Sequence, residues 1–93
     1  MELGQHEAAL QDLQRQLALN SEEATTHFNV AICYRNIGQT NSALQSINTA
    51  IEQSPATGVF YAFRSAVYTD LGQTALAQAD AQRAQSLGNG APQ

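Results

Sequence analysis

The sequence contains no lysine, and its four arginines are scattered along 93 residues that carry a net charge of −4. A nucleic-acid-binding surface needs clustered basic residues to displace the counterions of the phosphate backbone. We therefore expect no nucleic-acid partner. The lack of lysine also excludes two kinds of site that depend on this residue, a lysine-containing phosphate loop and a Schiff base.

Cysteine occurs once, at Cys33, so no disulfide can form within the chain. A lone thiol is typical of a reducing compartment, and we expect a cytoplasmic location. No apolar run approaches the roughly 20 residues that a membrane-spanning helix requires. No signal segment is recognisable at the N-terminus, although a longer parent protein could carry one upstream. We expect no membrane contact.

Only two prolines occur, and the apolar content comes from alanine, leucine and isoleucine more than from aromatic residues. There are sixteen alanines and twelve glutamines. Both residue types are good helix formers, so the composition favours an all-α protein. A chain of this length can bury one hydrophobic core, and we expect a single domain over residues 1–93.

The sequence repeats itself every 34 residues. Gly4, Gly38 and Gly72 are spaced at this interval, each is followed by glutamine, and an alanine stands five residues after each glycine. A 34-residue period built from two helices is the signature of a helical solenoid, in which each unit packs against its neighbours. The spacing thus predicts a helical repeat protein.

Apolar residues three and four positions apart predict five helices. We expect them over residues 5–19, 22–37, 41–53, 57–71 and 74–87. Gly38 and Gly72 should end two of them, because glycine tolerates the left-handed conformation at a helix C-terminus. The tail over residues 88–93 should be disordered. Glu22 and Glu23 should lie in the first turn of the second helix, where the helix dipole favours acids. Thr40 or Asn41 should cap the third helix, and Thr74 should cap the fifth.

Arranged on this period, the chain resembles the tetratricopeptide repeats, whose two helices combine small and large residues around a glycine turn and end at proline. Residues 24–57 fit a complete unit through Ala31, Tyr34, Gly38, Ala43, Ile47, Ala50 and Pro55. Residues 58–87 fit a C-terminal unit through Tyr61, Ser65, Tyr68, Gly72, Ala77 and Ala84. Residues 3–23 fit only the second half of a unit, through Gly4, Ala9, Leu13 and Leu17. The resemblance implies a right-handed helical solenoid of antiparallel helix pairs.

The two ends of the chain differ from the middle unit. Gln78, Ala81 and Gln85 stand where the middle unit has apolar residues, as expected of a terminal helix that faces water. At the other end, Asp12 stands at the place of an acid whose arginine partner would lie in a preceding helix. This favours a chain cut from a longer array over the simpler interpretation, in which Asp12 is a solvated surface acid.

The resemblance also implies an ion pair. Bacterial members of the family with similar sequences pair arginine and aspartate at the places that Arg64 and Asp80 occupy here. We therefore predict that these two residues pair across the fourth and fifth helices. Loss of one partner would leave a partly buried charge.

Ligands of this family lie along the concave surface formed by the first helix of each unit, and the resemblance implies such a groove here. Phe28 and Phe63 are the expected anchors, because large apolar groups in concave sites carry much of the binding energy. Each could instead fill space between units. The two interpretations are balanced for Phe28, and the groove is favoured for Phe63. The implied groove consists of Thr25, Phe28, Asn29, Ile32, Arg35, Asn36, Val59, Ala62, Phe63, Ala66, Thr69 and Asp70.

One subtype of the family grips the terminal carboxylate of a peptide with lysine, arginine and asparagine side chains. Only Asn29 fits that pattern here. Apolar residues stand where the subtype has polar or basic groups, namely Phe28, Ile32, Val59 and Phe63. We therefore do not expect an acidic chaperone tail as the ligand.

Nothing in the sequence indicates catalysis, a metal or a cofactor. His6, His27 and Cys33 lack a ligand spacing that would predict a metal site. The hydroxyl groups cluster at helix ends without a paired base, and the glycines occur singly. Cys33 lies among small and apolar neighbours and should be an inert core thiol. We expect a non-enzymatic protein.

Two functions fit these observations. The first is an interaction module that binds a peptide or helix of a protein partner in the groove. The second is a structural repeat segment that self-associates, as a homodimer or array, through an open N-terminal end. There Ala9, Leu13 and Leu3 would form a small uncovered apolar patch.

Overall fold

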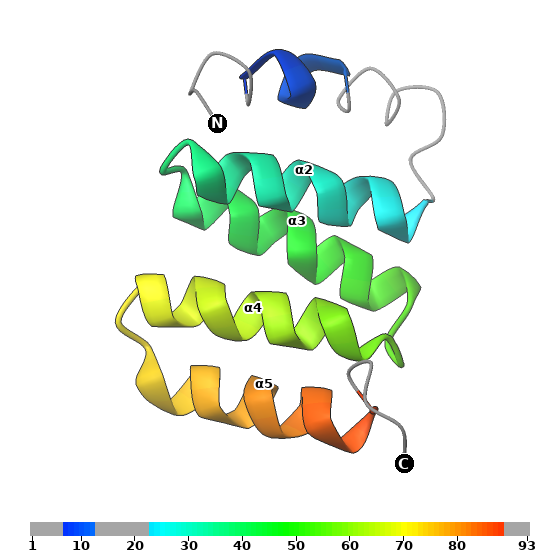
Figure 1. The fold of residues 1–93 in the computed structure, drawn as a ribbon, viewed down its shortest axis with the longest axis vertical. Helices are drawn as coiled ribbons and strands as arrows, with labels where there is room; N and C mark the ends of the chain where they lie inside the picture. The colour runs from blue at the N-terminus through cyan, green and yellow to red at the C-terminus, as the bar shows by residue number, and fades with distance from the viewer. Residues whose placement is uncertain (1–6, 13–22, 89–93) are drawn as a thin grey trace.

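The structure is a computed structural model that describes residues 7–12 and 23–88. Within these ranges residues 7–12 are helical, and four further helices follow: α2 (Ala24–Asn36), α3 (Thr40–Gln53), α4 (Gly58–Asp70) and α5 (Thr74–Ser86). Successive helices run in opposite directions and stack along the long axis of the molecule, the α2–α3 pair beside the α4–α5 pair (Figure 1). The described part of the chain is thus an all-α helical solenoid, as the period predicts.

The expected helix limits agree with α2 to α5 to within two residues, whereas most of the helix expected over 5–19 lies outside the described residues. The expected tail also lies outside them, apart from Gly88. The expected N-caps are wrong. Gln39 and Gln73 occupy the N-cap positions of α3 and α5 and make no side-chain capping bond, so Thr40 and Thr74 are the first helical residues.

Glu23 is likewise the N-cap residue of α2 rather than part of its first turn, and its side chain does not cap the helix. The connections between paired helices explain the shift at Gln39 and Gln73. Each connection is so short that the residue after the turn glycine already accepts a bond of the next helix, as in the Ala43 N–H bond to the Gln39 carbonyl, 3.0 Å. The position ahead of each helix is therefore held by glutamine, whose side chain makes no capping bond.

Glycine turns join the two helices of each pair. Gly38 and Gly72 have φ of 82° and 76°, in the left-handed region. After α2, the Gln39 N–H donates to the Tyr34 carbonyl at 2.9 Å and the Gly38 N–H donates to the Arg35 carbonyl at 3.1 Å. These two hydrogen bonds are the pattern of a Schellman motif, and they satisfy carbonyl groups that the end of the helix would leave unpaired.

The core lies between the two helix pairs. Ala31, Ala43, Ile47 and Ala50 are fully buried, because small residues let α2 and α3 approach closely while Ile47 fills the space beside them. The main cluster extends across the pairs and contains Ala31, Ile47, Ala50, Ile51, Phe60, Tyr61 and Ala84. A second cluster joins residues 7–12 to α2 and contains Leu10, Val30 and Cys33.

The outer face of α5 is open. Gln78, Ala81 and Gln85 are all exposed, whereas Ile47 and Ile51 of α3 are buried and Leu44 is half-buried. Leu76, also on α5, is 49% exposed. None of the described helices combines the length and the apolar character that crossing a membrane would demand.

The left-handed turn gives the first prediction. A Cβ at position 38 would meet no atom within 4 Å, so Gly38→Ala would cost free energy through backbone strain alone. We expect a loss of about 1 kcal/mol in the free energy of unfolding, measured by chemical denaturation. Gly38→Asn is the control and should lose less, because asparagine visits this conformation more readily. If Gly38→Ala lost no more stability than Gly38→Asn, the positive φ at position 38 would not be the cause of the loss.

Candidate functional site

The candidate site is the surface shared by α2 and α4, here called the α2/α4 face. It comprises the residues of the groove implied by the sequence, from Thr25 to Asn36 on α2 and from Val59 to Asp70 on α4. None of these side chains is fully buried. The exposed ones are Thr25, Asn29, Asn36, Val59, Thr69 and Asp70, and the half-buried ones are Phe28, Ile32, Arg35, Ala62, Phe63 and Ala66.

An aromatic contact joins the two helices in the middle of this face. The ring centroid of Phe28 lies 5.0 Å from that of Phe60 and 5.5 Å from that of Phe63, the second pair being edge-to-face. Phe60 is buried, whereas Phe28 and Phe63 are half-buried and pack against the main core cluster. Both phenylalanines therefore fill space between the helix pairs and also present part of their surface to solvent. The space-filling role considered for Phe28 and Phe63 is thus compatible with an accessible surface.

An ion pair crosses the same face. Arg35 Nε donates to Asp70 Oδ2 at 2.6 Å, and Arg35 Nη2 donates to Asp70 Oδ1 at 3.3 Å. The two side chains are 37% and 35% exposed. The hydrogen bond from Arg35 lowers the pKa of the Asp70 carboxyl below its ordinary value. Arg35 was expected to be a polar handle for a ligand, but its charge is already paired.

Sequence reasoning did not predict this pair, because the 34-residue offset aligns Arg35 with Thr69. Asp70 stands one repeat plus one residue after Arg35. Equivalent helices of neighbouring units lie side by side, so a residue and its copy shifted by one position can meet across them. That shift is the only sequence signal for the pair.

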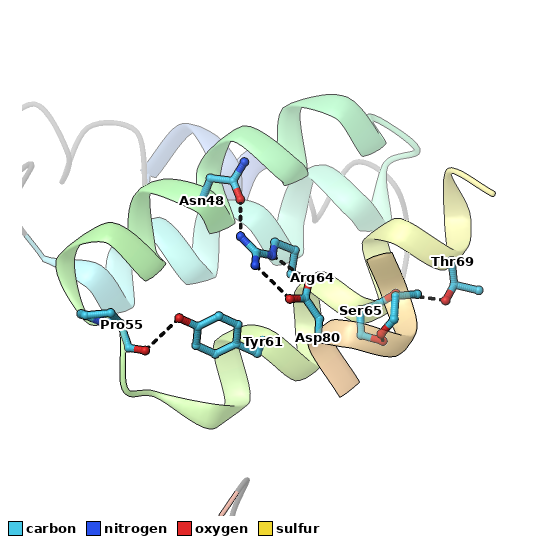
Figure 2. A network of polar contacts seen from close by, with 8 residues as sticks. Asn48, Pro55, Tyr61, Arg64, Ser65, Thr69 and Asp80 are labelled. Carbon is cyan, nitrogen blue, oxygen red and sulfur yellow. Dashed lines mark hydrogen bonds and ion pairs between the residues drawn. The ribbon is translucent and has the colours of Figure 1, made fainter. Parts of the chain in front are cut away.

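The opposite side of α4 carries a polar network (Figure 2). Arg64 Nε donates to Asp80 Oδ2 at 2.7 Å, Nη2 donates to Asp80 Oδ1 at 2.9 Å, and Nη1 donates to Asn48 Oδ1 at 2.9 Å. The Asp80 residue is only 6% exposed. The hydrogen bonds to Asp80 raise the pKa of Arg64. One guanidinium thus links α3, α4 and α5.

Aromatic rings and hydroxyl groups complete this side of α4. The Arg64 guanidinium lies 5.4 Å from the ring centroid of Tyr61 and 5.6 Å from that of Tyr68. Tyr61 Oη donates to the Pro55 carbonyl at 2.8 Å, and Ser65 Oγ donates to the Ala77 carbonyl at 2.7 Å. Among the described residues, every buried side-chain nitrogen and oxygen has a hydrogen-bond partner. This network joins α4 to α3 and α5.

The remaining candidate groups give no sign of reactive chemistry. Cys33 is buried, and burial raises the pKa of its thiol, which keeps it protonated and unreactive. Within residues 7–12 and 23–88, no group of three or more His, Cys, Asp and Glu could hold a metal ion. His6 lies outside the described residues.

The two ion pairs should differ in what they contribute to stability. Arg64→Met leaves the buried Asp80 carboxylate without its cation, and we expect a loss of about 2 kcal/mol in the free energy of unfolding. Arg35→Met is the matched control: it breaks an exposed pair and should cost less than about 1 kcal/mol. Chemical denaturation of both variants provides the test. Equal losses would contradict the expectation that the buried pair contributes more to stability than the exposed pair.

The Arg35–Asp70 pair should also respond to acid. Since the pKa of Asp70 is lower in the folded than in the unfolded state, the unfolded state binds more protons between the two values. The stability from this pair is therefore complete above the ordinary aspartate pKa of about 3.9 and is lost as the pH falls through the folded-state pKa. Carbon-13 NMR of the Asp70 carboxyl should show a low pKa that Arg35→Met returns toward the ordinary value. An identical titration in both proteins would contradict the assignment.

Comparisons with known proteins address the family. The sequence model of the tetratricopeptide repeat family matches residues 24–57. A search of curated protein sequences finds no significant match.

Solved structures with this fold include three that cover nearly the whole chain. MamA of strain MSR-1 superposes with a TM-score of 0.86 at 18% identity and covers 95% of this chain, which spans 51% of MamA. The second repeat domain of Spaghetti (RPAP3), bound to the HSP90 peptide SRMEEVD, superposes with a TM-score of 0.86 at 25% identity. The match covers 90% of this chain and 78% of that domain. The Yersinia enterocolitica type III secretion translocator chaperone SycD superposes with a TM-score of 0.89 at 20% identity. The match covers 96% of this chain and 67% of SycD.

The chain thus spans about half the length of MamA and about two thirds of SycD. The likeness at these identities concerns the fold, and it agrees with the helix pairs, the glycine turns and the small residues at the core of each pair. Residues 24–57 thus match the tetratricopeptide repeat, and the described part of the chain shares the fold of these solved structures.

Proposed function

We propose that this chain is a non-enzymatic interaction module that binds a short peptide or helix of a protein partner on its α2/α4 face. The observation that carries the proposal is the half-buried aromatic contact between Phe28 and Phe63 at the centre of that face. Aromatic side chains that are fixed by packing and still partly accessible lose little conformational entropy when a ligand covers them.

Charge and exposure support an apolar ligand. Val59 is 46% exposed, and only it and Leu76 are large, exposed apolar side chains in the part of the chain that the structure describes. The face carries two charged residues, Arg35 and Asp70, which neutralise one another. Asn29 is exposed and can bind the backbone of a peptide through its amide. A partner would therefore supply apolar side chains toward the aromatic centre.

The structural comparison supports the general class of function. The Spaghetti repeat domain, at 25% identity, was solved with the peptide SRMEEVD. That peptide is acidic, and each arginine among residues 23–88 of this chain already contacts an acid or an aromatic ring. We infer that this chain shares the mode of a peptide on a repeat surface and prefers a less acidic peptide.

Self-association has less support. Ala9 was expected to be uncovered, but it is half-buried and packs against the cluster of Leu10, Val30 and Cys33. Leu3 and Leu13, the other members of the expected patch, lie outside the described residues.

A matched pair of charge substitutions tests the proposed face. Val59 and Leu76 are exposed to similar extents and lie in the first turns of α4 and α5, where the helix dipole favours an acid. Val59→Asp and Leu76→Asp should therefore both fold, which circular dichroism can verify. Only Val59→Asp places a charge on the α2/α4 face.

The ligand for this test is selected from a displayed library of random peptides with the unmodified chain as bait. Fluorescence polarisation then gives its Kd for each variant. We expect Val59→Asp to weaken binding at least about tenfold, because burying a charge against apolar groups is costly. Leu76→Asp should change the Kd less than about twofold. The reverse order would place the site on α5.

A further inference from the structure

The Arg35–Asp70 pair has the geometry with which arginine recognises a carboxylate on a ligand. Two nitrogens of one guanidinium, Nε and Nη2, donate to the two oxygens of one carboxylate at 2.6 and 3.3 Å. This two-bond arrangement is the form that makes arginine selective for carboxylates. Because both side chains are more than one third exposed, the pair lies within reach of a ligand on the α2/α4 face.

Arg35 is the sole cation of that face within the described residues. Arg64 is engaged with Asp80 and Asn48 on the opposite side of α4. Arg83 lies on α5, with its guanidinium 5.6 Å from the ring centroid of Tyr61. A carboxylate on a bound peptide could therefore find only Arg35, and Asp70 already occupies it.

Stability gives only a weak reason for an acid at position 70. Asp70 is the last residue of α4, where the helix dipole is unfavourable for a negative charge. An exposed ion pair contributes little to folding. The two small effects oppose each other, so replacing Asp70 with its neutral isostere should leave the unfolding transition nearly unchanged.

We propose that Asp70 is a specificity-determining residue: it satisfies Arg35 internally and thereby excludes peptides that carry a carboxylate from the α2/α4 face. The inference rests on the proposed function, because it concerns the ligands of the same face. A peptide carboxylate can bind Arg35 only by displacing Asp70, and it also meets the repulsion of the displaced acid. An uncharged peptide meets neither cost.

The substitution Asp70→Asn tests this directly. The probe is the acidic peptide SRMEEVD, labelled with a fluorophore and titrated at low ionic strength so that screening stays weak. We expect about tenfold tighter binding to Asp70→Asn than to the unmodified chain, which corresponds to one charge-assisted hydrogen-bonded contact made available. The double variant Arg35→Gln, Asp70→Asn should lose this gain.

Glu52→Gln is the matched control. Glu52 is an exposed acid on α3, so this variant changes the net charge by the same amount without touching Arg35. If Glu52→Gln tightens binding as much as Asp70→Asn does, the effect is one of overall charge and the proposal is wrong. An unchanged affinity of Asp70→Asn for the acidic peptide would also overturn it.

A second readout and a second probe separate the possible failures. In Asp70→Asn, the Arg35 Nε–H signal in nitrogen-15 NMR should shift when the acidic peptide is added. A purely structural role of Asp70 would not predict this shift. Between the unmodified chain and Asp70→Asn, the library-selected apolar peptide should not show the tightening that the acidic peptide shows. Failure of that peptide to bind either protein would count against the proposed function, whereas an unmoved Arg35 signal would count against Asp70 alone.

Discussion

The close approach of the two helices within a unit is the constraint on which the rest of this structure depends. Ala31 on α2 and both Ala43 and Ala50 on α3 have no exposed surface, and Ile47 fills the space beside them. Larger residues at the alanine positions would overpack a close-packed interior. The helix α4 packs on this pair through α3, and it meets α2 through the Phe28–Phe63 contact and the Arg35–Asp70 ion pair.

The helix α4 separates two environments of different chemistry. Toward α2 it presents Phe63, whose half-buried ring meets Phe28 edge-to-face. Toward α3 and α5 it presents Arg64, which carries charge into the interior and is compensated by Asp80 and Asn48. A buried pair of this kind is weak evidence for stability, but it requires both partners and therefore fixes how the helices are placed. The polar side of α4 thus contacts α3 and α5, and the side toward α2 keeps Phe63 partly exposed.

The 34-residue period was sufficient to predict the helix pairs and the left-handed glycine turns, because each depends on position within a unit. It was insufficient where side chains of different units meet at unequal positions. Arg35 and Asp70 are one residue out of step with the period, and Asn48 joins Arg64 from a helix that pairwise reasoning left out. The cap expected for α3 was placed too late in the sequence, because Gln39, whose carbonyl accepts the first bond of the helix, is itself the N-cap residue.

The few cations of this chain bear on the ligand that we propose for the α2/α4 face. Among residues 23–88 each arginine has a different environment: Arg35 in an exposed pair, Arg64 in a buried network, and Arg83 against an aromatic ring. Because the chain has a net charge of −4 and no lysine, it would repel an acidic ligand, and each arginine among residues 23–88 is already in contact with an acid or an aromatic ring. Under the proposed function, affinity on the α2/α4 face comes from apolar contact with Phe28, Phe63 and Val59. Under the proposal for Asp70, specificity comes from the charges that the face rejects, so a single acid at the end of α4 matters more for ligand choice than for folding.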